Sequence, residues 1–148
     1  MREILFRGKR LYNGDWVEGY LYEHEPPLVG IVSEKDEPEA SKWFIARTGF
    51  ADWNMPRPVE FVEIDPSTVG QYTGMKDKNG DRIFEGDVAK VLQGKDKDIA
   101  YVGFENGAFM LYPKTGNIYE RTLWSYWYND WDVEVIGNIT DNPELLEK

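Results

Sequence analysis

Apolar and polar residues alternate with a period of two along most of the chain, which favours strands over helices. The first two alternating runs, residues 3–12 and 15–22, are separated by a turn that contains Asn13-Gly14. Asn-Gly between two such runs is typical of a tight β-hairpin. The pattern therefore predicts an N-terminal hairpin. On one face of its second strand we expect Trp16, Gly19 and Leu21.

The remainder of the first half predicts short strands between loops. A stretch rich in proline and acidic residues holds one apolar island, which predicts a strand near 28–33 and an acidic loop at 34–41. Residues 42–47 and 59–64 are rich in aromatic and β-branched residues and predict two more strands, joined by a loop at 50–58.

A break is expected at residues 65–68, Asp-Pro-Ser-Thr, which we interpret as a short helical turn. We place a domain boundary there, with an N-terminal β-rich subdomain at 1–66 and a second subdomain at 67–148. Strands are predicted in the second subdomain at 83–92, 98–104, 107–113, 117–123 and 132–139. Short strands at this spacing, separated by Asn-Gly and Thr-Gly turns, are typical of a small, strongly bent barrel. Near the end, Asn142 and Pro143 predict one helical turn.

Composition limits the classes of function. The chain of 148 residues is 41% hydrophobic and 15% aromatic, which indicates a folded protein. Its net charge of −10 repels a phosphate backbone, so we expect no direct contact with nucleic acid. It has no cysteine, which excludes disulfides, thiolate metal sites and a cysteine nucleophile. No apolar run is long enough to span a membrane, and we expect a cytoplasmic protein.

Residues 71–91, QYTGMKDKNGDRIFEGDVAKV, place four acidic side chains around two turns, between two apolar runs. Asp77, Asn79 and Asp81 match the first three ligand positions of a calcium loop. The match then fails, because such a loop needs glycine where Arg82 stands and glutamate where Val88 stands. A carboxylate pair for acid–base chemistry is a second interpretation.

A structural interpretation of the same stretch explains more of its residues. Asn79-Gly80 suits a tight turn in which both residues have positive φ. A bend at Glu85-Gly86 would follow, with Asp87 accepting hydrogen bonds from nearby backbone amides. We therefore expect neither a bound metal nor a cofactor.

Three blocks of this sequence resemble the YopX family of phage and prophage proteins. They are the stretch 71–91, the closing block VIGNITDNPELL at 135–146, and the opening MREILFRGKR at 1–10. The resemblance implies a mainly β (β-rich α+β) fold, in which the N-terminal β-hairpin subdomain precedes a small SH3-like barrel. It also implies an origin in a mobile element and self-association, and it supplies no catalytic residue. The residues that carry over as family signature are Tyr72, Thr73, Gly74, Asp77, Gly80, Glu85, Gly86 and Asp87.

Two further features outside the blocks could contribute to function. His24 is the single histidine and lies in an acidic, proline-containing stretch, where a solvent-exposed loop position is favoured over a catalytic one. The aromatic run at 123–131 is interpreted as a strand that belongs to the barrel core, forms a protein interface or stacks a ligand. Its candidate interface residues are Trp124, Tyr126, Trp127, Tyr128 and Trp131.

The sequence thus favours a non-enzymatic accessory protein of phage or prophage origin, which acts in the bacterial cytoplasm. It would associate with itself and bind a host or phage protein through the aromatic run and the acidic loop at 34–41. One alternative is an acidic DNA mimic that inhibits a host nucleic-acid enzyme. The other is a divalent-ion enzyme that uses the carboxylates of Asp77, Asp81, Glu85 and Asp87.

Overall fold

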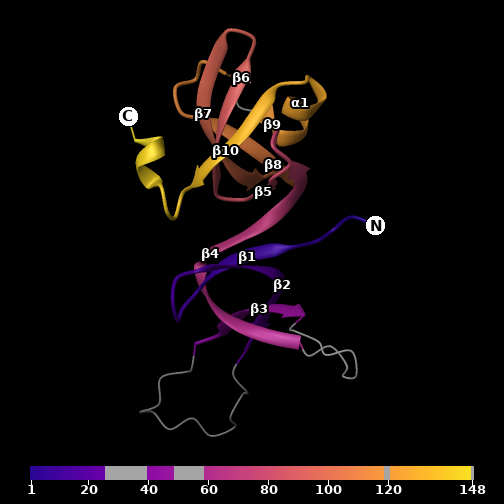
Figure 1. Cartoon of the computed structure of the whole chain (residues 1–148), viewed down its shortest axis with the longest axis vertical. Coiled ribbons are helices and arrows are strands. Elements are labelled where there is room, and N and C mark those ends of the chain that lie inside the picture. The colour runs from indigo at the N-terminus through magenta and orange to yellow at the C-terminus, as the bar shows by residue number, and fades with distance from the viewer. Residues whose placement is uncertain (26–39, 49–58, 119–120, 148) are drawn as a thin grey trace, which may run out of the picture. The chain divides into compact units, whose positions relative to one another are not determined.

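The computed structural model describes residues 1–25, 40–48, 59–118 and 121–147. The protein is mainly β, with two antiparallel five-stranded sheets (Figure 1). Contacts within the chain define two compact units: one comprises Leu5–Val69, and the other comprises Met1–Ile4 together with Gly70–Lys148. We call them the N-terminal unit and the C-terminal unit. The division into subdomains at 1–66 and 67–148 stays a prediction.

The N-terminal unit is a ring of four antiparallel strands. Its strands are β1 (Phe6–Arg10), β2 (Trp16–His24), β3 (Lys42–Thr48) and the first part of β4 (Val59–Lys76). They pair in the order β1-β2-β3-β4, and β1 also pairs with β4, which closes the ring. Inside it pack Val17, Ile45 and Ile64, each at most 2% exposed. The predicted strand at 28–33 and loop at 50–58 lie outside the described residues.

The predicted hairpin is confirmed, with a first strand shorter than expected and a second strand that extends to His24. The amide of Arg10 donates to the carbonyl of Asp15 at 2.9 Å, and Gly14 has a φ of 73°. The predicted arrangement of faces is wrong. Val17 and Gly19 are buried, whereas Trp16 lies on the other face, where the Arg7 guanidinium stacks 4.7 Å from its ring centroid.

The helical turn predicted at residues 65–68 is also wrong, because β4 continues through it to Lys76. The carboxylate of Asp65 accepts bonds from the amide of Ser67 at 2.9 Å and from its hydroxyl at 2.7 Å. These local bonds pair the amide and the hydroxyl of Ser67 without a helical turn. Pro66 is tolerated because pairing with β3 ends at Ile64, so its missing N–H costs no bond there.

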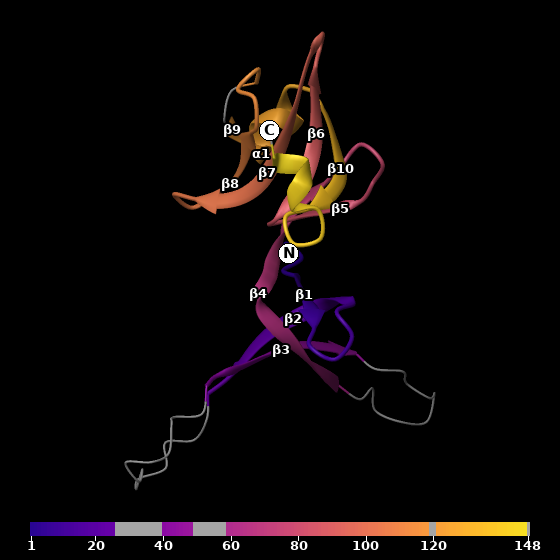
Figure 2. The same cartoon turned by 90° about the vertical axis from the view of Figure 1, so that its left-hand side faces the viewer.

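The C-terminal unit holds the second sheet. Its remaining elements are β5 (Arg82–Phe84), β6 (Asp87–Gln93), β7 (Asp96–Glu105), β8 (Ala108–Pro113), β9 (Arg121–Thr122), α1 (Leu123–Tyr128), β10 (Asp132–Asn138) and the 3-10 helix η1 (Pro143–Leu146). The sheet has the order β10-β6-β7-β8-β9, and β5 pairs with the end of β4 (Figure 2). The predicted tight turn at Asn106-Gly107 is confirmed by φ values of 51° and 81°.

The described part of the predicted strand at 117–123 includes β9 at Arg121–Thr122, and Leu123 begins a helix instead. The Thr122 hydroxyl accepts the amide of Ser125 at 3.3 Å and so caps the start of α1. At helical spacing, Leu123 and Tyr126 fall on one face, and both are buried in the core of the unit. The helix ends where Asp130 adopts a φ of 57°.

The closing turn predicted at Asn142 is confirmed as η1, with Asn142 as the preceding residue and Pro143 in the first turn. Neither helix in the described part of the chain is long and apolar enough to cross a membrane.

Candidate functional site

Asp77 is a buried carboxylate of the block at 71–91 that accepts three backbone hydrogen bonds. It is 7% exposed. Its Oδ1 accepts the amides of Asn79 and Asp81, both at 2.9 Å, and its Oδ2 accepts the amide of Val135 at 3.0 Å. The sequence analysis considered Asp77 as a metal ligand, but both of its oxygens point to backbone donors.

The loop that follows Asp77 covers the edge strand β10. The amide of Lys78 donates to the carbonyl of Val133 at 2.9 Å, and the ammonium of Lys78 lies 3.0 Å from the carboxylate of Glu134. This hydrogen-bonded ion pair raises the pKa of Lys78 and lowers the pKa of Glu134 from their ordinary values. Asp77 and Lys78 therefore form hydrogen bonds with backbone groups at the edge of the sheet, which would otherwise be unpaired.

Asp87 performs a similar structural task at the next turn. It is 1% exposed, and its Oδ2 accepts the amide of Phe84 at 2.8 Å. Gly86, which lies between Phe84 and Asp87, has a φ of 81°. Its amide donates to the carbonyl of Val102, and its carbonyl accepts the amide of Ile139, both at 2.8 Å. The predicted bend at 85–87 is confirmed, and Asp87 accepts a backbone amide as expected.

The other signature residues surround the β4–β5 pair. Tyr72 packs against Phe84 with ring centroids 5.6 Å apart, and the Thr73 hydroxyl donates to the carbonyl of Ile83 at 2.8 Å. Glu85 accepts the amide of Gln71 at 3.1 Å. Positive φ angles of 84° and 85° occur at Gly74 and Gly80.

One detail of the predicted turn is wrong, because Asn79 does not have a positive φ. Its amide bonds to the Asp77 carboxylate, which holds Asn79 in an Asx turn, so that Gly80 alone reverses the chain. Among the described residues, no three His, Cys, Asp or Glu side chains lie in an arrangement that could hold a metal ion.

Asp98 is a buried carboxylate that the sequence analysis missed. It is 4% exposed, and it accepts the Thr115 hydroxyl at 2.8 Å and the amides of Ile99, Thr115 and Asn117 at 2.8 to 3.1 Å. It therefore holds the loop after β8. Its alternation with apolar neighbours in β7, which places it on the buried face, is the sequence signal that could have identified it.

Asp98 predicts an acid-dependent loss of stability. Burial raises the pKa of its carboxyl, but the bonds from Thr115, Ile99 and Asn117 together lower it to below its ordinary value of 3.8. Its stabilising contribution is therefore complete above about pH 4 and is lost as the pH falls through the lowered pKa. Urea unfolding of the protein and of Asp98→Asn at a series of pH values checks this. We expect the variant to be less stable at pH 7 and to lose less stability on acidification; parallel pH profiles would contradict this assignment.

The aromatic run at 123–131 begins with the helix α1 and does not form the predicted strand. Tyr126 is fully buried, and Trp131 packs edge-on against it with ring centroids 4.7 Å apart. Trp124 is 58% exposed, on α1. The side chains of Trp127 and Tyr128, and residues 34–39 of the acidic loop, lie outside what the structure describes. His24 is exposed at the end of β2, with its ring centroid 6.3 Å from that of Tyr22.

An exposed aromatic face, which the sequence analysis missed, lies on the outside of the N-terminal unit. We define the outer face as Tyr20 and Tyr22 of β2, Phe44 of β3, and Val59 and Phe61 of β4. Strand register places them together, because Tyr22 pairs with Phe44, and Ala46 pairs with both Tyr20 and Phe61. The ring of Tyr22 lies 6.4 Å from that of Phe44 and 5.8 Å from that of Phe61.

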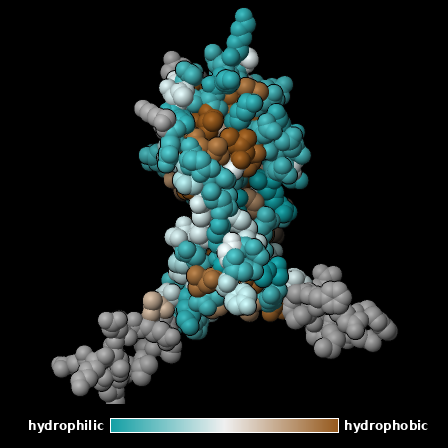
Figure 3. All heavy atoms as spheres, turned by 60° about the vertical axis from the view of Figure 1, so that its left-hand side comes forward, coloured by the Kyte–Doolittle hydropathy of each residue, from teal (hydrophilic) through white to brown (hydrophobic). Residues whose placement is uncertain are grey.

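Except for Phe44, which is partly buried, the residues of the outer face are between 47% and 67% exposed. Figure 3 shows apolar side chains at the surface among hydrophilic ones. The alternation of β2, in which Val17, Gly19 and Leu21 point inward, could have indicated that Tyr20 and Tyr22 point outward.

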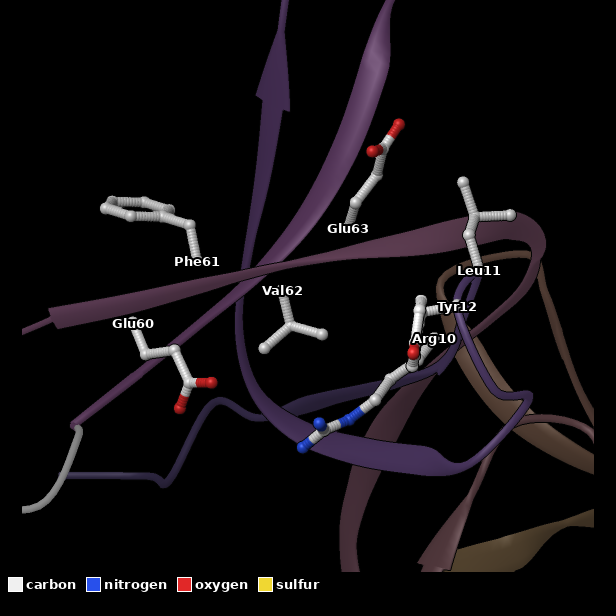
Figure 4. Close-up of a pocket in the computed structure, with 7 residues that line it drawn as sticks. All are labelled: Arg10, Leu11, Tyr12, Glu60, Phe61, Val62 and Glu63. Carbon is white, nitrogen blue, oxygen red and sulfur yellow. The ribbon is translucent and has the colours of Figure 1, made fainter.

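Beside the outer face is an open groove of about 560 Å³ (Figure 4). It lies between the end of β1 and β4, and its lining residues are Arg10, Leu11, Tyr12, Glu60, Phe61, Val62 and Glu63. In Figure 4, Glu60 and Val62 point to one side of β4, while Phe61 and Glu63 point to the other. The carboxylate of Glu60 also bonds to Arg47 at 2.9 Å.

Comparisons with known proteins concern both the family and the fold. The profile of the family described as YopX protein matches residues 6–147, nearly the whole chain. Among solved structures, the crystal structure of protein EF1440 from Enterococcus faecalis is similar, with a TM-score of 0.56 and 21% identity. The match covers 99% of this chain and 100% of that chain, and it supports the fold alone. No curated protein matches this chain significantly.

Proposed function

This chain belongs to the YopX family, and we propose that it is a non-enzymatic, self-associating protein-binding module. The observation that carries the proposal is the outer face, whose Tyr20, Tyr22, Phe44, Val59 and Phe61 expose apolar surface outside the ring of strands. Contiguous exposed apolar surface on a folded unit is typical of protein contact sites.

The composition of the outer face supports a protein partner. Tyrosine and phenylalanine are enriched in protein interfaces, where they provide large contact areas at low entropic cost. Polar side chains lie around the face rather than in its centre: Glu18 and His24 flank the tyrosines along β2, and Glu63 follows Phe61 on β4. An apolar centre with a polar rim is the usual anatomy of an interface.

We propose a second copy of the same chain as the occupant. The net charge of −10 repels another copy at long range, but salt at physiological strength screens charges beyond about 8 Å. Two apolar faces can then pack on each other around a twofold axis, the commonest symmetry of soluble oligomers. A host or phage protein would be bound in addition.

The signature carboxylates support a non-enzymatic role. Asp77 and Asp87 accept backbone amides in turns, and Glu85 accepts the amide of Gln71. These bonds give the carboxylates a structural task, so we assign the signature block to folding. We further propose that the C-terminal unit is an SH3-like barrel and that the protein is encoded by a phage or prophage and acts in the host cytoplasm.

Sedimentation velocity of matched surface variants tests this proposal. Phe61 on the outer face and Phe104 on β7 of the other unit are almost equally exposed, at 56% and 55%. Removing an aromatic anchor from an interface weakens association by about 30-fold. We expect Phe61→Ser to weaken self-association by about that factor and Phe104→Ser to behave as the unmodified protein. An unmodified protein that stays monomeric, or two variants with equal effects, would overturn the proposal.

A further inference from the structure

A second surface feature, in the C-terminal unit, brings three lysines together. Lys90 on β6 pairs directly with Ile99 on β7. The amide of Lys114, which follows β8, donates to the carbonyl of Ile99 at 2.7 Å and so continues the register on the other side. Lys97 precedes Ile99 by two residues and shares its face of the strand. Three ammonium groups from three adjacent strand segments therefore surround one isoleucine.

These lysines line a pocket of about 370 Å³ together with Asp98, Ile99, Thr115 and Asn117. The volume lies within the range of small-molecule binding sites. Ile99 and the aliphatic stems of the lysines supply an apolar wall, and Asn117 adds a side-chain amide at the exposed rim. The pocket thus combines an apolar body with polar groups, as ligand sites usually do.

Charge in the pocket is positive, although the whole chain carries −10. Three lysines and one carboxylate line the pocket, and both oxygens of that carboxylate, Asp98, already accept bonds from neighbouring backbone and hydroxyl groups. Glu134, which pairs with Lys90 across the strands, forms its ion pair with Lys78. Within the residues described, Lys97 has no ion pair.

Like charges on adjacent strands repel one another and destabilise a sheet. Lys90 and Lys114 lie two strands apart, or about 10 Å at the usual strand spacing. Lys97 pairs with Leu92 and lies diagonally from both. Lys114 is half-buried and donates to the carbonyl of Leu145 at 3.1 Å, which fixes its position at the edge of the pocket. An anion with more than one negative charge would relieve this repulsion and bond to several ammonium groups at once.

We propose that this pocket binds a small organic polyanion, a molecule that carries two or more phosphate or carboxylate groups. Lys90, Lys97 and Lys114 provide the charge, and Ile99 contacts the body of the ligand. Such a site gives the protein a small-molecule ligand in addition to the protein contact proposed for the outer face, and it is independent of that contact.

Binding of inorganic pyrophosphate and of citrate, each at constant ionic strength with chloride as reference, tests the proposal. Backbone amide signals in nuclear magnetic resonance titrations report the location, and we expect saturable shifts at Ile99, Thr115 and Asn117. A response to pyrophosphate alone assigns the site to phosphates, and a response to citrate alone assigns it to carboxylates. No response beyond that of chloride, or shifts spread over the whole surface, would overturn the proposal.

Matched glutamine variants test whether the lysines of the pocket bind the anion. The double variant Lys90→Gln, Lys97→Gln removes two exposed lysines of the pocket, and we expect affinity to fall about tenfold for each lost charge-assisted contact. Lys76→Gln, an exposed lysine of β4 outside the pocket, is the control and should leave the affinity unchanged. Equal affinities in all three proteins would show that the pocket does not bind the anion.

Discussion

Replacement of Asp77 by alanine is expected to lower the free energy of unfolding by about 3–5 kcal/mol, because it leaves three part-buried backbone donors without their acceptor. Those donors are the amides of Asn79, Asp81 and Val135. Asp77→Asn keeps one acceptor oxygen and should cost about half as much. Urea unfolding followed by circular dichroism measures both effects.

Asp81 provides the matched control for this prediction. It lies in the same loop, carries the same charge and is exposed, so Asp81→Ala should change stability by about 0.5 kcal/mol or less. If Asp77 were instead a metal ligand or a catalytic group, its replacement would leave the free energy of unfolding nearly unchanged. Equal unfolding midpoints for the Asp77 and Asp81 variants would therefore contradict the structural role of Asp77.

Truncation of Tyr126 to alanine should have an effect of similar size, about 3–5 kcal/mol, as expected for a large aromatic side chain removed from a core. Tyr126 is fully buried and contacts Trp131 edge-on, with ring centroids 4.7 Å apart. Thermal and urea unfolding measure the loss, and the change in near-ultraviolet circular dichroism of the aromatic residues reports it independently.

Trp124 lies two residues earlier on α1 and is 58% exposed. Comparing its alanine variant with that of Tyr126 distinguishes a core role of this run from an interface role. Trp124→Ala should cost about 0.5 kcal/mol or less. If the run were a strand with both aromatic side chains on one exposed face, the two variants would have similar small effects on stability. A small loss for Tyr126→Ala would contradict the helix and its packing.

The local turns of this fold were predictable because their chemistry lies within a few residues. Asn13-Gly14 and Asn106-Gly107 each specify a tight hairpin through positive φ, and Pro143 specifies the first turn of η1. The bend at Gly86 and the capping role of Asp87 followed from the same reasoning. In each case the residues that form the turn are adjacent in the sequence.

Features that depend on distant residues were not predictable. The run at 123–131 is dominated by aromatic residues, and its short pattern fits a strand as well as a helix. The cap at Thr122 and packing against the sheet favour the helix. Asp65 and Pro66 indicated a break, but pairing of β4 with β1 and then with β5 extends the strand through them.

The candidate surfaces were missed for the same reason. The outer face gathers residues from three strands, and the lysine pocket gathers Lys90, Lys97 and Lys114 from three strand segments. Neither set is a motif in the sequence, because strand register alone brings its members together. Within the signature block, Asp77 bonds to the amide of Val135, which is 58 positions away and could not be identified as its partner from the sequence.

Hydroxyl-radical footprinting of the unmodified protein at low and high concentration tests most directly the claim that the outer face mediates self-association. Oxidation of exposed side chains reports their burial. We predict that Tyr20, Tyr22 and Phe61 become protected as the concentration rises, whereas Phe104 and Trp124, exposed in the C-terminal unit, react at an unchanged rate. Protection of Trp124 without protection of Phe61, or no protection at any concentration, would contradict self-association through the outer face.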